Sequence, residues 1–134
     1  MSARIDHFVV GAADLDQGAQ WCRRTFGVDT GPGGQHAFMG THNRLLRVAT
    51  VNHPRAYLEV IAVDPAGQAP KDRSRWFDLD DATLQAQLVR EPQLIHWVVQ
   101  VPDLPGALAA WRRLGIDRGE AVHASRMTPR GLLQ

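Results

Sequence analysis

Two histidines and one glutamate in this sequence have the residue types and the placement to bind a metal ion. His7 opens the segment HFVVGAADL, and His96 opens the similar segment HWVVQVPDL. Glu59 is one of three glutamates and lies within YLEVIAV, the most apolar segment that reads as a strand. An unpaired carboxylate in such a strand would cost several kcal/mol, so Glu59 requires a partner. Two imidazoles and a carboxylate on one surface would bind a divalent metal and leave coordination positions open for substrate.

The two histidines belong to an internal repeat. Residues 7–29 (HFVVGAADLDQGAQWCRRTFGVD) and 96–117 (HWVVQVPDLPGALAAWRRLGID) share the His, two Val, an Asp-Leu pair and an Arg-Arg pair. Two copies are too few for a solenoid, so we expect two like modules that face each other across a pseudo-twofold axis. Residues at equivalent positions, including the two histidines, should then converge near that axis.

Each copy of the repeat predicts a strand followed by a helix. Asp14 would cap a helix over residues 15–26 that ends at Gly27. Asp103 and Gly115 would bound the second helix in the same way. Both helices are expected to cover one face of the sheet with their apolar stripes.

Strand periodicity predicts which side chains share a face. Because residues alternate along a strand, Phe8 and Trp97 are expected to point toward the two helices. His7, His96 and Glu59 then fall together on the opposite, concave face. This common face favours one joint site over three separate structural residues.

Three further strands complete the first module. Residues 35–39 and 43–51 predict a hairpin joined at residues 40–42, and residues 57–63 predict a buried strand. The first module therefore reads βαβββ.

The second module is shorter than the first. Asp80 or Asp81 would cap a short helix before the second copy, and strands are expected at residues 119–126 and from 131 onward. By comparison with the first copy, the second lacks about one and a half strands. We predict a single α+β domain over residues 1–134, built of paired βαβββ modules: module one at 3–63, a linker and short helix at 64–92, and an incomplete module two at 93–134.

Composition excludes several classes of function. The net charge is +1 and the 15 basic residues are scattered, which is unlike a nucleic-acid-binding surface. No apolar run approaches the roughly 18 residues of a membrane span, and the first strand begins without a leader segment. Cys22 is the single cysteine and has no disulfide partner within the chain, so we expect a cytoplasmic protein.

Three segments resemble a known superfamily. IDHFVVGAADL, YLEVIAV and LIHWVVQVPDL are similar to the first, fourth and fifth strands of the vicinal oxygen chelate superfamily, which includes lactoylglutathione lyases, extradiol dioxygenases, epimerases and metal-free bleomycin-resistance proteins. More narrowly, GGQH, GTHN and YLE resemble the glyoxalase-like domain proteins. The resemblance implies His7, Glu59 and His96 as metal ligands. A further carboxylate ligand, which lies on the eighth strand and is associated with proton transfer in the lyases, has no counterpart here, so the fourth ligand and the base stay open.

The resemblance implies a metal-dependent lyase or isomerase that acts on a small molecule with two adjacent oxygens. Zinc, nickel, manganese or iron would act as a Lewis acid there, with Glu59 as both a ligand and a catalytic residue. The same ligands would also suit an Fe(II) extradiol-type dioxygenase. The alternative from another class is a metal-free binding protein of the bleomycin-resistance type, in which the His and Glu side chains bond each other; an aromatic cavity lining would favour it.

Three polar residues around the predicted hairpin are candidates for substrate binding, namely His36, His42 and Asn43. The incomplete second module would leave sheet edges exposed. Because proteins cover or pair such edges, we expect a homodimer formed by strand or module exchange.

Overall fold

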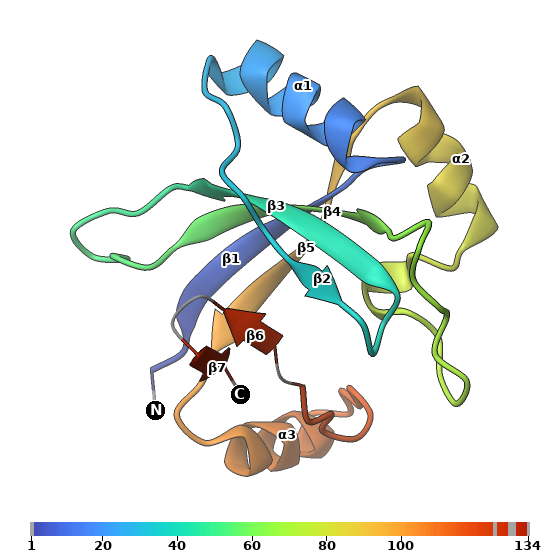
Figure 1. Cartoon of the computed structure of the whole chain (residues 1–134). Helices are drawn as coiled ribbons and strands as arrows, with labels where there is room; N and C mark the ends of the chain where they lie inside the picture. The colour runs from blue at the N-terminus through green and yellow to red at the C-terminus, as the bar shows by residue number, and fades with distance from the viewer. Residues whose placement is uncertain (1, 125, 129–130, 134) are drawn as a thin grey trace.

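A five-stranded mixed sheet forms the centre of the molecule (Figure 1). The structure is a computed structural model that describes residues 2–124, 126–128 and 131–133. The strand order is β2-β3-β4-β1-β5, with β1 parallel to β4 and the other neighbours antiparallel. This is the predicted α+β class. Along the described residues the elements are β1 (Arg4–Gly11), α1 (Leu15–Phe26), β2 (Gln35–His36), β3 (Thr41–Arg47), β4 (Tyr57–Val63), the 3-10 helix η1 (Trp76–Asp78), α2 (Ala82–Arg90), β5 (Gln93–Gln100), α3 (Leu104–Arg113), β6 (Arg126–Thr128) and β7 (Gly131–Leu133).

Both repeat helices begin where the sequence predicts. Asp14 accepts the Gln17 backbone N–H at 2.7 Å, and Asp103 accepts the Gly106 backbone N–H at 3.0 Å. Gly27 follows α1 with φ 69°, the left-handed conformation that commonly ends a helix. No helix in the described part of the chain has the length and apolarity to cross a membrane.

The strand predictions are confirmed for β1, β4 and β5 and need correction in the hairpin and near the C-terminal end. β2 ends at His36, and the hairpin turns through Gly40, whose φ is 60°, so β3 already begins at Thr41. The expected strand over 119–126 is wrong, because residues 119–124 have no regular structure. β6 and β7 instead pair with each other in a separate two-stranded sheet.

The two copies of the repeat meet as adjacent antiparallel strands. β1 and β5 pair with Phe8 opposite Trp97, which are equivalent residues of the repeat. His7 pairs with Val98, and His96 pairs with Val9, so a local twofold axis passes between Phe8 and Trp97. The expected convergence of equivalent positions is therefore found at the level of the backbone.

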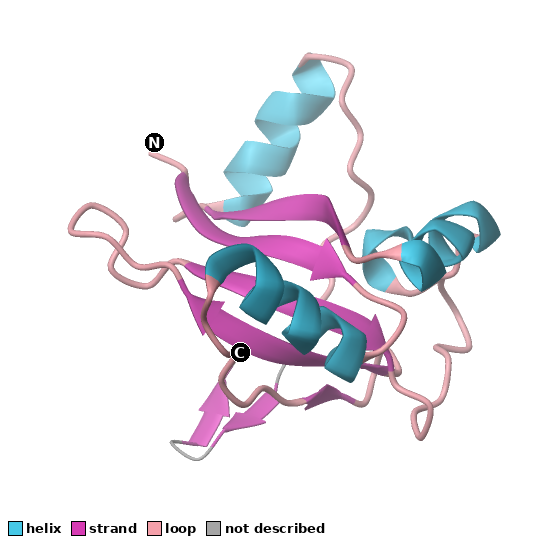
Figure 2. Cartoon of the chain, turned by 90° about the horizontal axis from the view of Figure 1, so that it is seen from above, coloured by secondary structure: helices cyan, strands magenta, loops and turns pink. Residues whose placement is uncertain are grey.

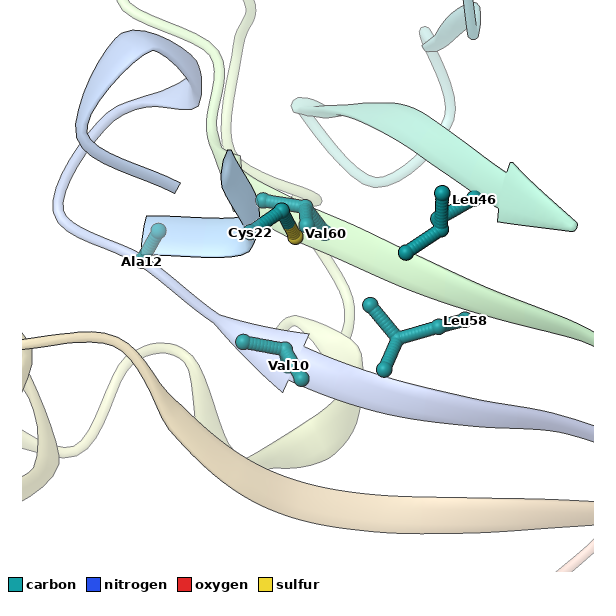
Figure 3. Packing of buried hydrophobic residues seen from close by; sticks show 6 residues of the cluster. All are labelled: Val10, Ala12, Cys22, Leu46, Leu58 and Val60. Atoms are coloured by element: carbon teal, nitrogen blue, oxygen red, sulfur yellow. The ribbon is translucent and has the colours of Figure 1, made fainter. Parts of the chain in front are cut away.

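Two apolar clusters hold the sheet from its two faces. Figure 3 shows the first, in which Cys22 of α1 packs on Val10, Leu46, Leu58 and Val60. The second joins the opposite face to the segment that carries η1 and α2; its buried members are Val9, Ile61, Leu79 and Leu88. Part of the concave face is thus filled by the protein itself.

The position of α3 differs from the prediction. α1 lies on one side of the sheet, and α3 lies with the β6–β7 hairpin on the other side (Figures 1 and 2). Trp97 is consequently 64% exposed and Phe8 37% exposed, and no residue of α3 is buried. The reason is the strand order: α1 packs over the three adjacent strands β3, β4 and β1, whereas β5 is an edge strand and offers a helix a much narrower apolar surface.

We predict that this exposed surface and the free edge of β5 pair with a second copy of the chain, which gives a homodimer. Trp97→Lys should shift the mass in solution from dimer to monomer. Val51→Lys is the control, because Val51 is an exposed apolar residue of a loop. A wild-type protein that is monomeric in solution at micromolar concentration would contradict the prediction.

Candidate active site

Glu59 and His7 lie together on the sheet face opposite α1. The register of β1 and β4 pairs His7 with Tyr57 and Val9 with Glu59, so Glu59 is a diagonal neighbour of His7. Glu59 Oε2 is 3.3 Å from His7 Nε2, and Glu59 is only 5% exposed. His7 is therefore a partner of the buried carboxylate.

His7 is held on its other side as well. Its Nδ1 lies 2.6 Å from Asp6 Oδ1, and its ring stacks on Tyr57 with a centroid separation of 4.5 Å. A ring nitrogen donates only when it carries a hydrogen, so an imidazolium satisfies both carboxylates at once. The arrangement is a cation between two anions.

The pKa values of this pair follow from the contacts. Burial alone would lower the pKa of His7, but the hydrogen bonds and charges of Glu59 and Asp6 outweigh burial and leave it raised. Burial alone would raise the pKa of Glu59, but hydrogen bonds from His7 and Asn43 and the positive charge of His7 leave it lowered. These contacts favour the charged form of each group.

Asn43 connects Glu59 to the hairpin. Its Nδ2 donates to Glu59 Oε1 at 2.6 Å and lies 3.2 Å from His36 Nε2. Its Oδ1 accepts the Gly34 backbone N–H at 2.8 Å. Of the three predicted substrate-binding residues, Asn43 and His36 thus lie beside Glu59, and both are buried.

His36 extends this chain of contacts to an aromatic group. Because the Asn43 amide donates to Nε2, His36 carries its hydrogen on Nδ1 and donates to Thr41 Oγ1 at 3.0 Å. Thr41 Oγ1 also accepts from the Trp76 indole at 3.2 Å. The Trp76 ring contacts His36, Phe38 and Phe77 at centroid separations of 5.0, 5.1 and 5.6 Å.

His96 shares the concave face but lies apart from the other two predicted ligands. Its partner in the sheet is Val9, which places it beside β1 on the face of Glu59. Its ring, however, contacts Phe77 at 5.2 Å, and its Nε2 lies 3.4 Å from Asp78 Oδ2. The predicted face is correct, while the three side chains do not converge.

The donors fit a metal ion only in part. A separation of 3.3 Å between His7 Nε2 and Glu59 Oε2 suits two ligands that each lie about 2.1 Å from one ion. Within the part of the chain that the structure describes, no three His, Cys, Asp or Glu side chains are close enough to hold an ion. His96 would have to leave Asp78 to become the third ligand.

His42 points to the other face of the sheet. It pairs with Ala62, one position from the Asn43–Ile61 pair, so its side chain lies on the side of α1. There it lines a cleft of about 550 Å³ together with Gln17 and Arg44. The structure does not bring His42 to the site of Glu59.

Sequence reasoning did not find four residues of this region, which are Asp6, Trp76, Phe77 and Asp78. Asp6 sits where the register of β1 and β5 shifts, and such a bulge has no clear sequence signal. The aromatic pair Trp76-Phe77 within the polar segment KDRSRWFDLDD was the available signal for the other three.

The sheet order and the paired His-strands define the fold of the vicinal oxygen chelate superfamily. The sequence profile described as "Glyoxalase-like domain" matches residues 5–133, and the chain belongs to this family. No curated protein matches the sequence.

Several solved structures share the fold. Methylmalonyl-CoA epimerase in complex with methylmalonyl-CoA and ammonium is 19% identical, with a TM-score of 0.59 over 87% of this chain and 72% of that one. A substituted Streptomyces coelicolor methylmalonyl-CoA epimerase with 2-nitronate-propionyl-CoA is 19% identical, with a TM-score of 0.59 over 96% and 81%. A hypothetical protein from Bacillus halodurans C-125 is 11% identical, with a TM-score of 0.59 over 98% and 80%. At these identities the likeness establishes the fold alone.

The charged pair predicts a stability that depends on pH in both directions. Glu59, with its lowered pKa, stabilises the fold above its ordinary value of 4.5, and this contribution is lost as pH falls through the folded pKa. His7, with its raised pKa, contributes fully below 6.5, and this is lost as pH rises through the folded pKa. The melting temperature of wild type relative to Glu59→Gln should therefore be highest between these two values. A difference that stays constant from acid to alkaline pH would contradict the pairing.

Two adjacent glycines give a matched test of the loop that holds Asn43. A Cβ at Gly33 would collide with the backbone carbonyl and the side-chain oxygen of Asn43, whereas a Cβ at Gly34 meets nothing within 4 Å. Gly33→Ala should destabilise the fold by about 1–3 kcal/mol, as overpacking does. Gly34→Ala should change stability by less than about 0.5 kcal/mol. Equal effects in denaturant unfolding would mean that the loop does not approach Asn43 closely.

Proposed function

We propose that the concave face transfers a proton next to a carbonyl group of a small molecule with two adjacent oxygens, as a metal-dependent isomerase or lyase. The observation that supports this most is the buried Glu59 carboxylate, with Oε1 fixed by Asn43 and Oε2 facing the His7 imidazole. A carboxylate and an imidazolium side by side form an acid–base pair. The epimerase neighbours favour the isomerase reaction, since inversion of a carbon requires a proton to leave and return.

In the proposed reaction, Glu59 is the base and His7 is the hydrogen-bond donor. Glu59 Oε2 takes the proton, the electrons of the broken C–H bond form the C=C bond of an enolate, and the carbonyl π electrons move to oxygen. The His7 N–H then donates to that oxygen and stabilises its charge. Asp6 and Tyr57 hold the imidazole ring in position for this task.

Metal dependence is part of the proposal, with His7, Glu59 and His96 as ligands. A divalent cation, when bound, would polarise both substrate oxygens as a Lewis acid. Proton acceptance by Glu59 Oε2 and proton donation by His7 Nε2 use the same atoms that would bind the metal. Elemental analysis of protein prepared without a metal-affinity tag therefore decides which role the pair has.

A metal-free binding protein is the second candidate. Two observations favour it: His7 and Glu59 satisfy each other, and Phe38, Trp76 and Phe77 form an aromatic group beside His36. Under this alternative, ligands bind without any exchange of protons at carbon.

Exchange of a substrate C–H proton with deuterated water tests the proposal. Hemithioacetals and acyl-CoA thioesters with a second carbonyl should exchange in the presence of wild-type protein, as followed by NMR with and without added zinc, nickel, manganese and ferrous iron. Glu59→Gln should lower the rate at least about 100-fold, the usual share of a general acid or base.

Glu91→Gln is the matched control, because Glu91 is exposed at the end of α2 and should leave the rate unchanged. Binding of these compounds without exchange would favour the binding protein. An unchanged exchange rate in Glu59→Gln would exclude Glu59 as the base.

A further inference from the structure

We propose that the turn formed by Trp76, Phe77 and Asp78 is a latch that holds His96 away from His7 and Glu59. This inference rests on the proposed role of the three side chains as one metal site. The latch sets whether a cation at the site has two protein ligands or three.

The sheet gives His96 the same relation to His7 that Glu59 has. On β4, Glu59 lies two positions from Tyr57, which pairs directly with His7. On β5, His96 lies two positions from Val98, which also pairs directly with His7. Such diagonal neighbours have Cα atoms about 7–8 Å apart, within reach of long and aromatic side chains. Glu59 makes this contact at 3.3 Å, whereas His96 turns away.

The contacts that turn His96 away come from the latch. Phe77 packs on the imidazole ring, and the Asp78 carboxylate faces Nε2 at 3.4 Å. Asp78 thereby gives the second histidine a carboxylate, as Glu59 does for the first. Phe77 and Asp78 border a cleft of about 450 Å³ that also reaches His96.

The backbone of the latch is strained. Phe77 and Asp78 both have φ of 58°, and two successive residues other than glycine rarely adopt the left-handed region. The strain is held from outside: the Trp76 indole donates to Thr41, Arg75 pairs with Asp80 at 2.6 Å, and Leu79 is buried. The strained conformation therefore persists only while these outside contacts hold it.

The contact between Asp78 and His96, which closes the latch, is weak. The side chain of Asp78 is 80% exposed and that of His96 is 32% exposed. Exposed ion pairs contribute little to stability, so a ligand that binds His96 can displace Asp78.

Asp78→Gly tests the latch directly, because glycine accepts the same φ and removes the carboxylate that faces His96. The apparent zinc affinity, measured by calorimetry, should rise by up to about fivefold, which is the largest effect expected of an exposed pair. The rise should vanish in the His96→Ala background. Asp72→Gly is the charge control, because Asp72 is an exposed carboxylate that pairs only with its neighbour Arg73 among the described residues, and it should give no rise.

A fall in affinity for Asp78→Gly that depends on His96 would overturn the latch, since Asp78 would then be a ligand or a support. An unchanged affinity would overturn it too. Ring contacts measured by NMR without metal give an independent result: wild type should show His96 against Phe77, and Asp78→Gly should show His96 against His7. If neither wild type nor Asp78→Gly binds metal, the metal part of the proposed function is wrong. The ring contacts then decide alone whether the latch exists: an unchanged contact of His96 with Phe77 in Asp78→Gly would overturn it.

Discussion

The buried charge of Glu59 is the constraint on which the rest of the structure depends. A carboxylate in the middle of a sheet is tolerated only when donors surround it. The donors come from both neighbouring strands, His7 on β1 and Asn43 on β3, so the strand order β3-β4-β1 is what makes the charge acceptable. The charge in turn fixes the register, because a slip of one residue in either strand would carry its donor to the opposite face.

The two copies of the repeat pair their histidines with carboxylates in different surroundings. The twofold axis between Phe8 and Trp97 gives each copy one histidine on the concave face. The first histidine meets a carboxylate from a central strand, and the second meets Asp78, from a strained and exposed turn. The first pair is therefore buried, while the second is largely open to solvent. A symmetric backbone thus carries two histidine–carboxylate pairs that differ in burial.

The parts of the molecule that follow local rules could be predicted from the sequence. The caps at Asp14 and Asp103 and the bounds of β4 depend on short segments, and the common face of His7, Glu59 and His96 depends only on strand parity. The rest depends on backbone geometry that has weak sequence signals. The prediction for His42 failed because the hairpin turns before Thr41 and not at residues 40–42. His42 and Asn43 are therefore successive residues of β3, and their side chains point to opposite faces of the sheet. The left-handed pair Phe77-Asp78, which contacts His96, is held in part by the hydrogen bond between Trp76 and the distant Thr41.

The metal-dependent and metal-free readings of the site have one electrostatic origin. Asp6 and Glu59 place two negative charges around His7, and in this structure a proton on His7 balances them in part. A divalent cation in place of that proton would reduce the repulsion between the two carboxylates. It would also leave the imidazole neutral, the form in which histidine binds metals. Under the proposed function, a proton and a metal ion would compete for the same group of anionic side chains. The concentration of available metal, the pH and the position of His96 would then decide between them, so that one fold could serve a metalloenzyme or a binding protein without any change in its sheet.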